Sequence, residues 1–334
     1  MSPDTFELQL LNDYQRGFPL VAEPYAEIAR QLAIPESTLL ASLQNLQQNG
    51  KISRIGAVFR PHVLGYSTLA ALACPADRLE AVARQVGEYR EVNHNYEREH
   101  EYNLWFVVTA PSRADVDGVL AGIHRTTSLR PLDLPMLADY HIDLGFDLNG
   151  RRRAHQDVAG TRIDAALLRS QLEAVDYNLA AALEPGLPLG HRPFQQLGAS
   201  CGLDEDACLQ RIQHLLDLSV IRRFGIVVRH RELGFGANAM VVWDVPDELL
   251  ESIGQELGRQ DGVTLCYQRP RRLPDWPYNL FSMLHGQDRA AVLARLDALR
   301  HDLGLSDIPC RPLFSQRRFK QCGAHYSVAP ARVA

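Results

Sequence analysis

The chain repeats itself imperfectly, and this repeat constrains its fold more than any other feature of the sequence. Residues 54–60 read RIGAVFR, and the same frame returns at residues 223–229 as RFGIVVR. Residues 102–106, YNLWF, are echoed by YNLF at residues 278–281. A spacing of about 170 residues is too long for a solenoid unit, whose repeats reach roughly 50 residues. We therefore predict two copies of one domain pair, with function specialised where the copies differ.

The composition is that of a globular protein with a sizeable core. The 334 residues are 46% hydrophobic, which suits two or more domains. No stretch is apolar for long enough to span a bilayer, and the acidic N-terminus lacks the apolar region of a secretory signal. The six cysteines form no CxxC pair or zinc-like spacing. These features predict a cytoplasmic protein with reduced thiols and no membrane segment.

The charge balance narrows the choice of ligand. A formal net charge of −5 disfavours a generic nucleic-acid binder. Arginine dominates the basic residues, because only Lys51 and Lys320 are lysines among the 35 lysines and arginines. Arginine holds carboxylates bidentately, as a polyacidic ligand would require. The other explanation, the arginine codon preference of a GC-rich genome, stays open.

Apolar periodicity and turn signals predict the same order of elements in both copies. Residues 24–33 and 36–48 read as two helices followed by a wing strand over 52–59, which is a winged helix-turn-helix. Strand, helix, strand, strand, helix and strand follow in ferredoxin-like βαββαβ order, and we expect the last strand of the first copy over 137–147. The fold class is α+β, a tandem duplication of these two modules. The expected boundaries are 1–60 and 166–229 for the winged modules, 61–148 and 230–326 for the ferredoxin-like domains, and 149–165 for an exposed linker.

A winged helix followed by a ferredoxin-like domain resembles the AsnC/Lrp family of regulators, in copy one (residues 1–148) and again in copy two (residues 166–326). The expected recognition helix of copy one, residues 36–48, contains no arginine or lysine. That of copy two starts with three acids at 204–206 and has a lone Arg211. DNA binding is driven by cations that contact phosphates. We therefore expect both winged helices to be scaffolding, and no DNA partner.

The strand at residues 92–98, VNHNYER, carries the side chains best suited to chemistry. Period-two alternation places His94, Tyr96 and Arg98 on one face. An imidazole titrates near neutrality, a guanidinium binds a carboxylate, and aromatic rings suit a flat ligand. Three polar side chains on one face of a sheet need partners. Each residue taken alone also has a structural explanation. The histidine could be a hydrogen-bonded structural residue, and Arg98 could pair with Glu97 or Glu101 at the surface.

These residues fall in motifs that resemble the signatures of siroheme decarboxylases. Residues 92–98 with 101–106 resemble (S/N)HNYER…YNLWF, and residues 266–270 with 274–281 resemble HCYERP…PDWPYNLF. The arrangement is similar to the fused two-subunit form of heme d1 biosynthesis. The resemblance implies removal of carboxyl groups from two acetate side chains of siroheme, giving 12,18-didecarboxysiroheme. It implies no cofactor, because the iron tetrapyrrole is itself the substrate, and it implies companion decarboxylase subunits as partners besides siroheme.

Aligning the copies predicts one working site, in copy one. Tyr96 falls opposite Tyr267 and Arg98 opposite Arg269, but His94 falls opposite Leu265. The resemblance implies that arginines orient the carboxylates, while a histidine manages the proton or, as the alternative for His94, ligates the siroheme iron. No metal site is expected from the protein alone. The expected catalytic residues are His94, His100 and Arg98, and the expected substrate-binding residues are Tyr96, Tyr102, Arg54, Arg60, Arg223, Arg229, Arg269 and Tyr267.

Two other functions stay open at this point. One is a transcriptional regulator of the AsnC/Lrp type, including a heme-sensing one, and the other is a tetrapyrrole carrier without catalysis. The family pairs its sheets, and fusion satisfies that pairing within one chain as an internal pseudo-dimer. A homodimer of such chains is the alternative.

Overall fold

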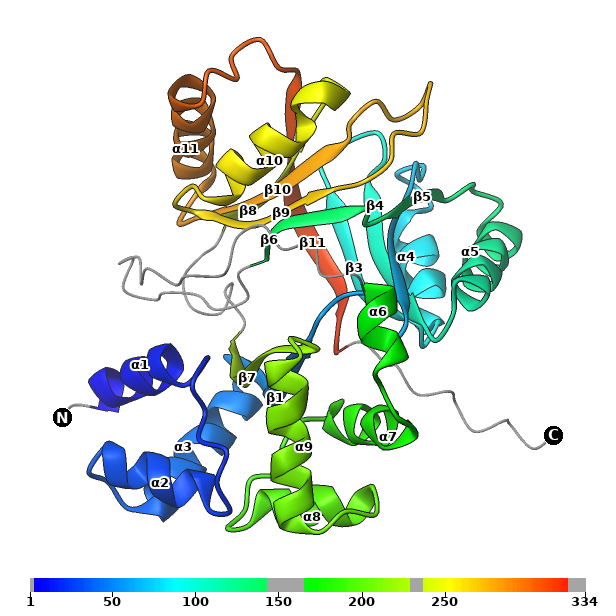
Figure 1. Cartoon of the computed structure of the whole chain (residues 1–334). Coiled ribbons are helices and arrows are strands. Elements are labelled where there is room, and N and C mark those ends of the chain that lie inside the picture. The colour runs from blue at the N-terminus through cyan, green and yellow to red at the C-terminus, as the bar shows by residue number, and fades with distance from the viewer. Residues whose placement is uncertain (1–2, 143–164, 229–236, 324–334) are drawn as a thin grey trace.

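The protein divides into a helical body and a sheet body. In the computed structural model, residues 3–142, 165–228 and 237–323 are described. Helices and a two-stranded sheet form the helical body, and a nine-stranded sheet flanked by helices forms the sheet body (Figure 1). Each body takes elements from both copies. The predicted α+β fold and its duplication are therefore confirmed.

The helical body has one core that both copies fill. That core takes Tyr25 and Leu43 from copy one and Phe194 and Ile212 from copy two, so the two winged modules are packed as one unit. The linker predicted over 149–165 lies outside the described residues up to residue 164, and Ala165 begins a helix. The elements of this body are α1 (Pro3–Asp13), α2 (Pro24–Gln31), α3 (Glu36–Gln48), β1 (Ile52–Phe59), α6 (Ala165–Ser170), α7 (Ala174–Leu183), α8 (Pro193–Ser200), α9 (Glu205–Asp217) and β7 (Ile221–Val228).

The two wing strands pair with each other rather than within their own modules. β1 and β7 run antiparallel, with Gly56 opposite Gly225. Gly225 is required by close packing, because a Cβ at this position would lie 2.4 Å from the carbonyl oxygen of Tyr14. The repeated RIGAVFR and RFGIVVR motifs thus form one two-stranded sheet between the copies.

The sheet body contains two ferredoxin-like units side by side. Its strand order is β5-β2-β4-β3-β11-β8-β10-β9-β6, so each copy contributes its fourth, first, third and second strands in that order. Copy one supplies β2 (Tyr66–Leu72), α4 (Leu79–Glu88), β3 (Val92–Arg98), β4 (Leu104–Ala110), α5 (Arg113–Thr127), β5 (Leu132–Pro135) and β6 (Ala138–Ile142). Copy two supplies β8 (Ala237–Trp243), the 3-10 helix η2 (Asp247–Leu249), α10 (Leu250–Gly258), β9 (Val263–Gln268), β10 (Leu280–Gly286), α11 (Arg289–Asp302) and β11 (Cys310–Gln321).

The copies exchange the ends of their last strands. The strand expected over 137–147 does not close copy one's own sheet; β5 does, and β6 continues onto β9 of copy two. Pro135 is the last residue of β5 and has no N–H to donate to a further ladder bond. In copy two, the single strand β11 both closes its own sheet and continues into the other copy. Residues 310–314 pair with β8, and residues 315–321 pair with β3.

Apolar side chains fill both sides of the nine-stranded sheet. Two cores lie under the helices, one in each copy. A third core lies on the opposite side, which we call the inner face, and contains Trp105 of copy one together with Trp276 and Phe281 of copy two. The inner face is therefore where the two copies meet. Among the described residues, no helix is long and apolar enough to cross a membrane.

Candidate functional site

The three polar residues predicted to share a face of β3 do share it. Tyr96 lies opposite Trp105 and His94 opposite Val107 in the ladder with β4, and both neighbours pack in the inner core. Asn95 points the other way, where its Nδ2 donates to the carbonyl oxygen of Ala83 at 2.9 Å. His94, Tyr96 and Arg98 therefore face the region between the copies.

His94 is held as a neutral imidazole. Its Nδ1 lies 2.6 Å from Oδ1 of Asn93, and Nδ2 of Asn93 donates to Thr109 Oγ1 at 2.9 Å. Because that second bond leaves Oδ1 as the acceptor, the pattern assigns the proton to Nδ1 and the lone pair to Nε2. The ring stacks on Tyr96 with centroids 6.2 Å apart. Burial lowers the pKa of His94 to about 4.

This pKa predicts a stability loss in acid that depends on His94. Between pH 6.5 and 4 the unfolded chain binds a proton at His94 that the folded chain does not, so the free energy of unfolding falls as the pH falls through this window. The loss amounts to about 3 kcal/mol at pH 4 and is absent above pH 6.5. Urea unfolding at pH 7 and pH 4 measures it, with His94→Leu as the matched variant. Equal losses in both proteins would contradict the assignment.

Arg98 is a buried cation with no counter-ion among the residues that the structure describes. Its side chain is 8% exposed, and Nη1 donates to the carbonyl oxygen of Leu313 at 2.9 Å. Its guanidinium lies 5.8 Å from the ring centre of Tyr96, and within the described part of the chain it forms no ion pair. Burial lowers the pKa of Arg98 to about 10. A buried charge is costly unless it is paired, so this position favours an anionic ligand.

Copy two has an equivalent arginine and tyrosine at this site, but it lacks the imidazole. Arg269 is 9% exposed, lies 4.6 Å from the ring centre of Tyr267, and donates from Nη1 to the carbonyl oxygen of Leu134. Each arginine thus reaches the fourth strand of the other copy, as a pseudo-twofold axis requires. Leu265, at the position equivalent to His94, packs against the inner core.

His100 and Tyr102 form a separate aromatic group at the far end of β3. A strand rises about 3.3 Å per residue, so Arg98 lies about 13 Å along the strand from His94, and His100 lies beyond it. Nδ1 of His100 accepts from the backbone N–H of Tyr102 at 3.0 Å, and its ring meets that of Trp276 edge-on at 5.3 Å. The structure therefore does not bring His100 next to His94.

One of the wing arginines lies at the His94 end of β3. Nη2 of Arg54 donates to the carbonyl oxygen of Ala57 at 3.0 Å. Nη1 of Arg54 lies against Gly323, 3.5 Å from where a Cβ would stand. Gly323 lies two residues after Gln321, which is opposite His94 in the ladder of β11 with β3. Arg54 is thus placed near the His94 end of the site in copy one.

The other wing arginines have protein partners. Nε of Arg60 donates to the carbonyl oxygen of Ser219 at 3.0 Å, and its Nη1 lies 4.0 Å from Asp139. Arg223 is buried and donates from Nη1 to the carbonyl oxygen of Gln15 at 2.6 Å. Arg229 lies outside the described residues. A substrate-binding role for these three arginines stays a prediction.

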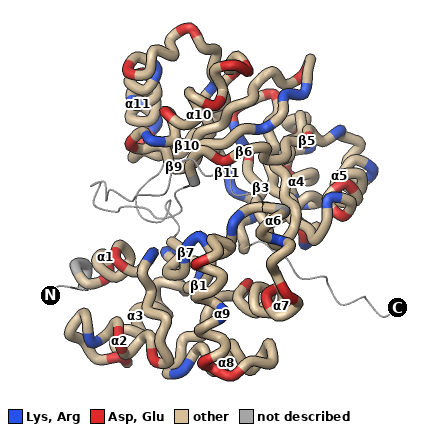
Figure 2. The backbone as a smooth tube through the Cα atoms, viewed as in Figure 1, with Lys and Arg blue, Asp and Glu red and all other residues tan. Residues whose placement is uncertain are grey.

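The exchange of strands between the copies brings residues next to the site that the sequence pattern did not reveal. Arg318 of β11 lies opposite Tyr96, and Gln321 lies opposite His94. On the other side, Asp139 of β6 lies opposite Tyr267. Basic positions therefore gather where β11, β7 and α6 approach one another, at the junction of the two bodies (Figure 2). In the sequence, the only sign of these residues was the basic run RRFK at residues 317–320, near the end of β11.

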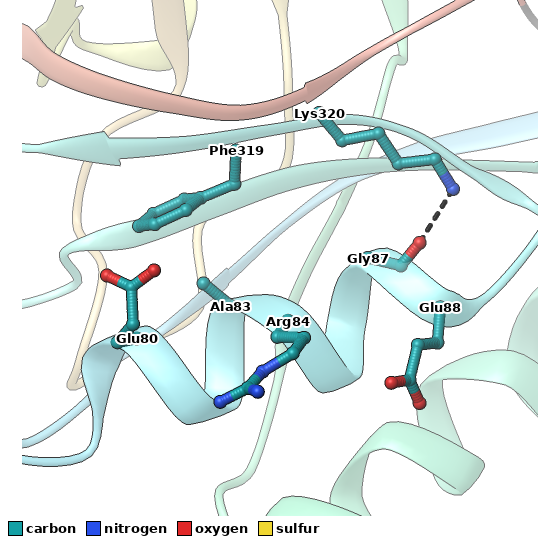
Figure 3. A pocket seen from close by; sticks show the side chains of 7 residues that line it. All are labelled: Glu80, Ala83, Arg84, Gly87, Glu88, Phe319 and Lys320. Carbon is teal, nitrogen blue, oxygen red and sulfur yellow. Dashed lines mark hydrogen bonds between the residues drawn. The ribbon is translucent and has the colours of Figure 1, made fainter.

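A cavity of about 640 Å³ lies on the outer side of the sheet, between α4 and β11 (Figure 3). Charged and apolar side chains line it, but Nζ of Lys320 is already bonded to the carbonyl oxygens of Gly87 and Tyr89. None of the residues predicted for the site lies there. Its lining residues are Glu80, Ala83, Arg84, Gly87, Glu88, Phe319 and Lys320.

The recognition helices offer no phosphate-binding surface. Arg211, the lone cation in α9, binds the buried Asp176 with both Nε and Nη2, at 2.5 and 2.7 Å. Its guanidinium also lies 3.2 Å from Glu173. These bonds tie α9 to α7, so Arg211 stabilises the helical body rather than pointing outward for DNA.

Comparisons with known proteins agree with this fold. The AsnC-like ligand binding domain family matches residues 63–141 and 232–320, and the siroheme decarboxylase NirDL-like HTH domain family matches residues 7–52 and 176–222. The siroheme decarboxylase NirDL subunit of Paracoccus pantotrophus is 43% identical over 97% of this chain and 98% of its own length. The NirD subunit of Stutzerimonas stutzeri is 53% identical over 44% of this chain and 97% of its own length. A crystal structure of NirDL with an iron-uroporphyrin III analogue superposes with a TM-score of 0.67 at 26% identity, covering 97% of this chain and 94% of that one.

Proposed function

This chain belongs to the family of NirDL-type siroheme decarboxylases, and we propose that it removes carboxyl groups from two acetate side chains of siroheme to give 12,18-didecarboxysiroheme. The observation that carries the proposal is the buried Arg98, which lacks a counter-ion among the described residues and shares the inner face of β3 with a neutral His94. A carboxylated, flat tetrapyrrole supplies the missing anion and an aromatic surface for Tyr96.

The decarboxylation requires two groups from the protein, one to orient the carboxylate and one to supply a proton. Arg98 orients an acetate carboxylate, whose C–C bond breaks to release carbon dioxide and leaves the electron pair on the methylene carbon, where the macrocycle delocalises it. One proton then converts that carbon to a methyl group. Nε2 of His94 takes up a proton from solvent and transfers it, and a bound carboxylate favours the imidazolium by raising its pKa. Ligation of the siroheme iron is the other role open to the same nitrogen.

The proposed reaction also has consequences for the cofactor, the partners and the location of the protein. The tetrapyrrole acts as its own electron sink, so we propose that no added cofactor takes part. The NirD subunit spans less than half of this chain, which supports an internal pseudo-dimer, with companion subunits of the pathway as partners. The described residues include six free cysteines, which suits the reducing cytoplasm.

Anaerobic incubation of the purified protein with siroheme tests the function. The expected product is lighter than siroheme by two molecules of carbon dioxide, which mass spectrometry resolves. A tetrapyrrole of unchanged mass with a shifted absorption spectrum would indicate a carrier. A gel-shift assay with the upstream DNA of the same operon is the control for the regulator, and no shift is expected because both recognition helices lack free cations.

A further inference from the structure

The two copies place opposite charges at one equivalent position. Arg318 of β11 lies opposite Tyr96 in copy one, and Asp139 of β6 lies opposite Tyr267 in copy two. Residues directly opposite in an antiparallel ladder point to the same face. A cation therefore stands beside the first tyrosine and a carboxylate beside the second, on the inner face in both cases.

Asp139 is joined to two arginines of the helical body. Its Oδ2 accepts from Nη1 of Arg222 at 3.0 Å and lies 4.0 Å from Nη1 of Arg60. Because Arg223 corresponds to Arg54 in the repeat, the counterpart of Arg222 in copy one is Ser53. The pair of Ser53 and Arg318 cannot form this ion pair. An ion pair of this kind therefore cannot form between the equivalent positions of copy one.

Asp139 also faces the space next to Arg269. The imidazole of His62 is affected by both groups: burial, Arg269 and Arg169 lower its pKa, while Asp139 raises it. Nε2 of His62 is buried and has no hydrogen-bond partner among the described residues. Asp139 lies opposite Tyr267, and the guanidinium of Arg269 lies 4.6 Å from the ring centre of the same tyrosine. The carboxylate therefore lies beside the place where a ligand of Arg269 would approach.

We propose that Asp139 is an internal carboxylate that closes copy two to carboxylated tetrapyrroles, so that each chain binds a single tetrapyrrole, at copy one. This inference rests on the proposed function. Asp139 occupies Arg60 and Arg222, and its charge repels an incoming acetate or propionate group, which is a repulsive element of the kind that creates specificity. The pair is partly solvated, since the Asp139 side chain is 34% exposed, so its contribution to stability is small.

Titration with iron-uroporphyrin III tests the proposal. Binding stoichiometry, measured by absorption and by isothermal calorimetry, is expected to be one per chain for the wild-type protein and to double in Asp139→Asn. The amide keeps the shape of the side chain and removes its charge. Glu97→Gln is the matched control, because Glu97 is a sheet carboxylate on the outer face that pairs with Arg317 at 3.1 Å, and its stoichiometry is expected to stay at one.

The outcomes separate this inference from the function beneath it. A stoichiometry of two in the wild-type protein, or of one in a folded Asp139→Asn variant, would overturn the closing role of Asp139 and leave the proposed function standing. No binding by the folded wild-type protein would overturn the proposed function together with the inference. Circular dichroism at the titration temperature establishes that each variant is folded.

Discussion

Replacing Arg98 by methionine is expected to weaken the binding of iron-uroporphyrin III by at least about 100-fold, which corresponds to about 3 kcal/mol. The reason is that Arg98 is the one buried cation of β3, on the face where the proposed function places the ligand. Methionine matches its length without its charge. Loss of a charge-assisted bond in a desolvated site is among the largest single-residue effects on affinity.

The same substitution is not expected to destabilise the protein. The buried guanidinium has a single hydrogen-bond partner, Leu313, and no ion pair in the described residues. Replacing an uncompensated buried charge by an apolar side chain of similar volume is often neutral or stabilising. The free energy of unfolding should therefore stay within about 1 kcal/mol of the wild-type value or exceed it.

Arg317→Met is the matched control for this prediction. Arg317 belongs to β11 but faces α4, where it binds Glu80 at 2.6 Å, and its side chain is 47% exposed. Neither affinity nor stability should change by much. If Arg98→Met lost stability and kept its affinity, Arg98 would be a structural residue and the anion site would lie elsewhere.

The order of elements and the face of β3 could be predicted from the sequence, because both depend on local periodicity. Alternation along residues 92–98 placed His94, Tyr96 and Arg98 together, and the structure agrees. The loss of the imidazole at Leu265 was visible because the two copies align without gaps along this strand. These predictions needed no information about which strand pairs with which.

The sheets of the two copies were expected to pair, but which strands pair with which could not be predicted, because strand partners distant in sequence leave no periodic signal. Arg318 and Asp139 join the two halves of the site only because β11 and β6 each continue into the other copy. The same limit applies to Arg223, whose partner Gln15 lies 208 residues away in the chain. The shared sheet of β1 and β7 has the same cause.

His94→Ala is expected to lower the rate of carbon dioxide release from siroheme by about 10²- to 10⁴-fold, the usual contribution of a positioned acid or base. Leu265→Ala, at the equivalent position of copy two, is expected to leave the rate close to that of the wild-type protein. The contrast follows from the imidazole, since leucine can neither transfer a proton nor ligate iron. Both residues lie on the inner side of the sheet, so the two variants probe the copies at matched depth.

The central claim is that one working site, built around His94, lies in copy one. Carbon dioxide release from siroheme under anaerobic conditions, measured side by side for the wild-type protein, His94→Ala and Leu265→Ala, tests it most directly. The account predicts near-complete loss in the first variant and near-wild-type release in the second. Retention of most activity in a folded His94→Ala variant, or loss of activity in a folded Leu265→Ala variant, would contradict it.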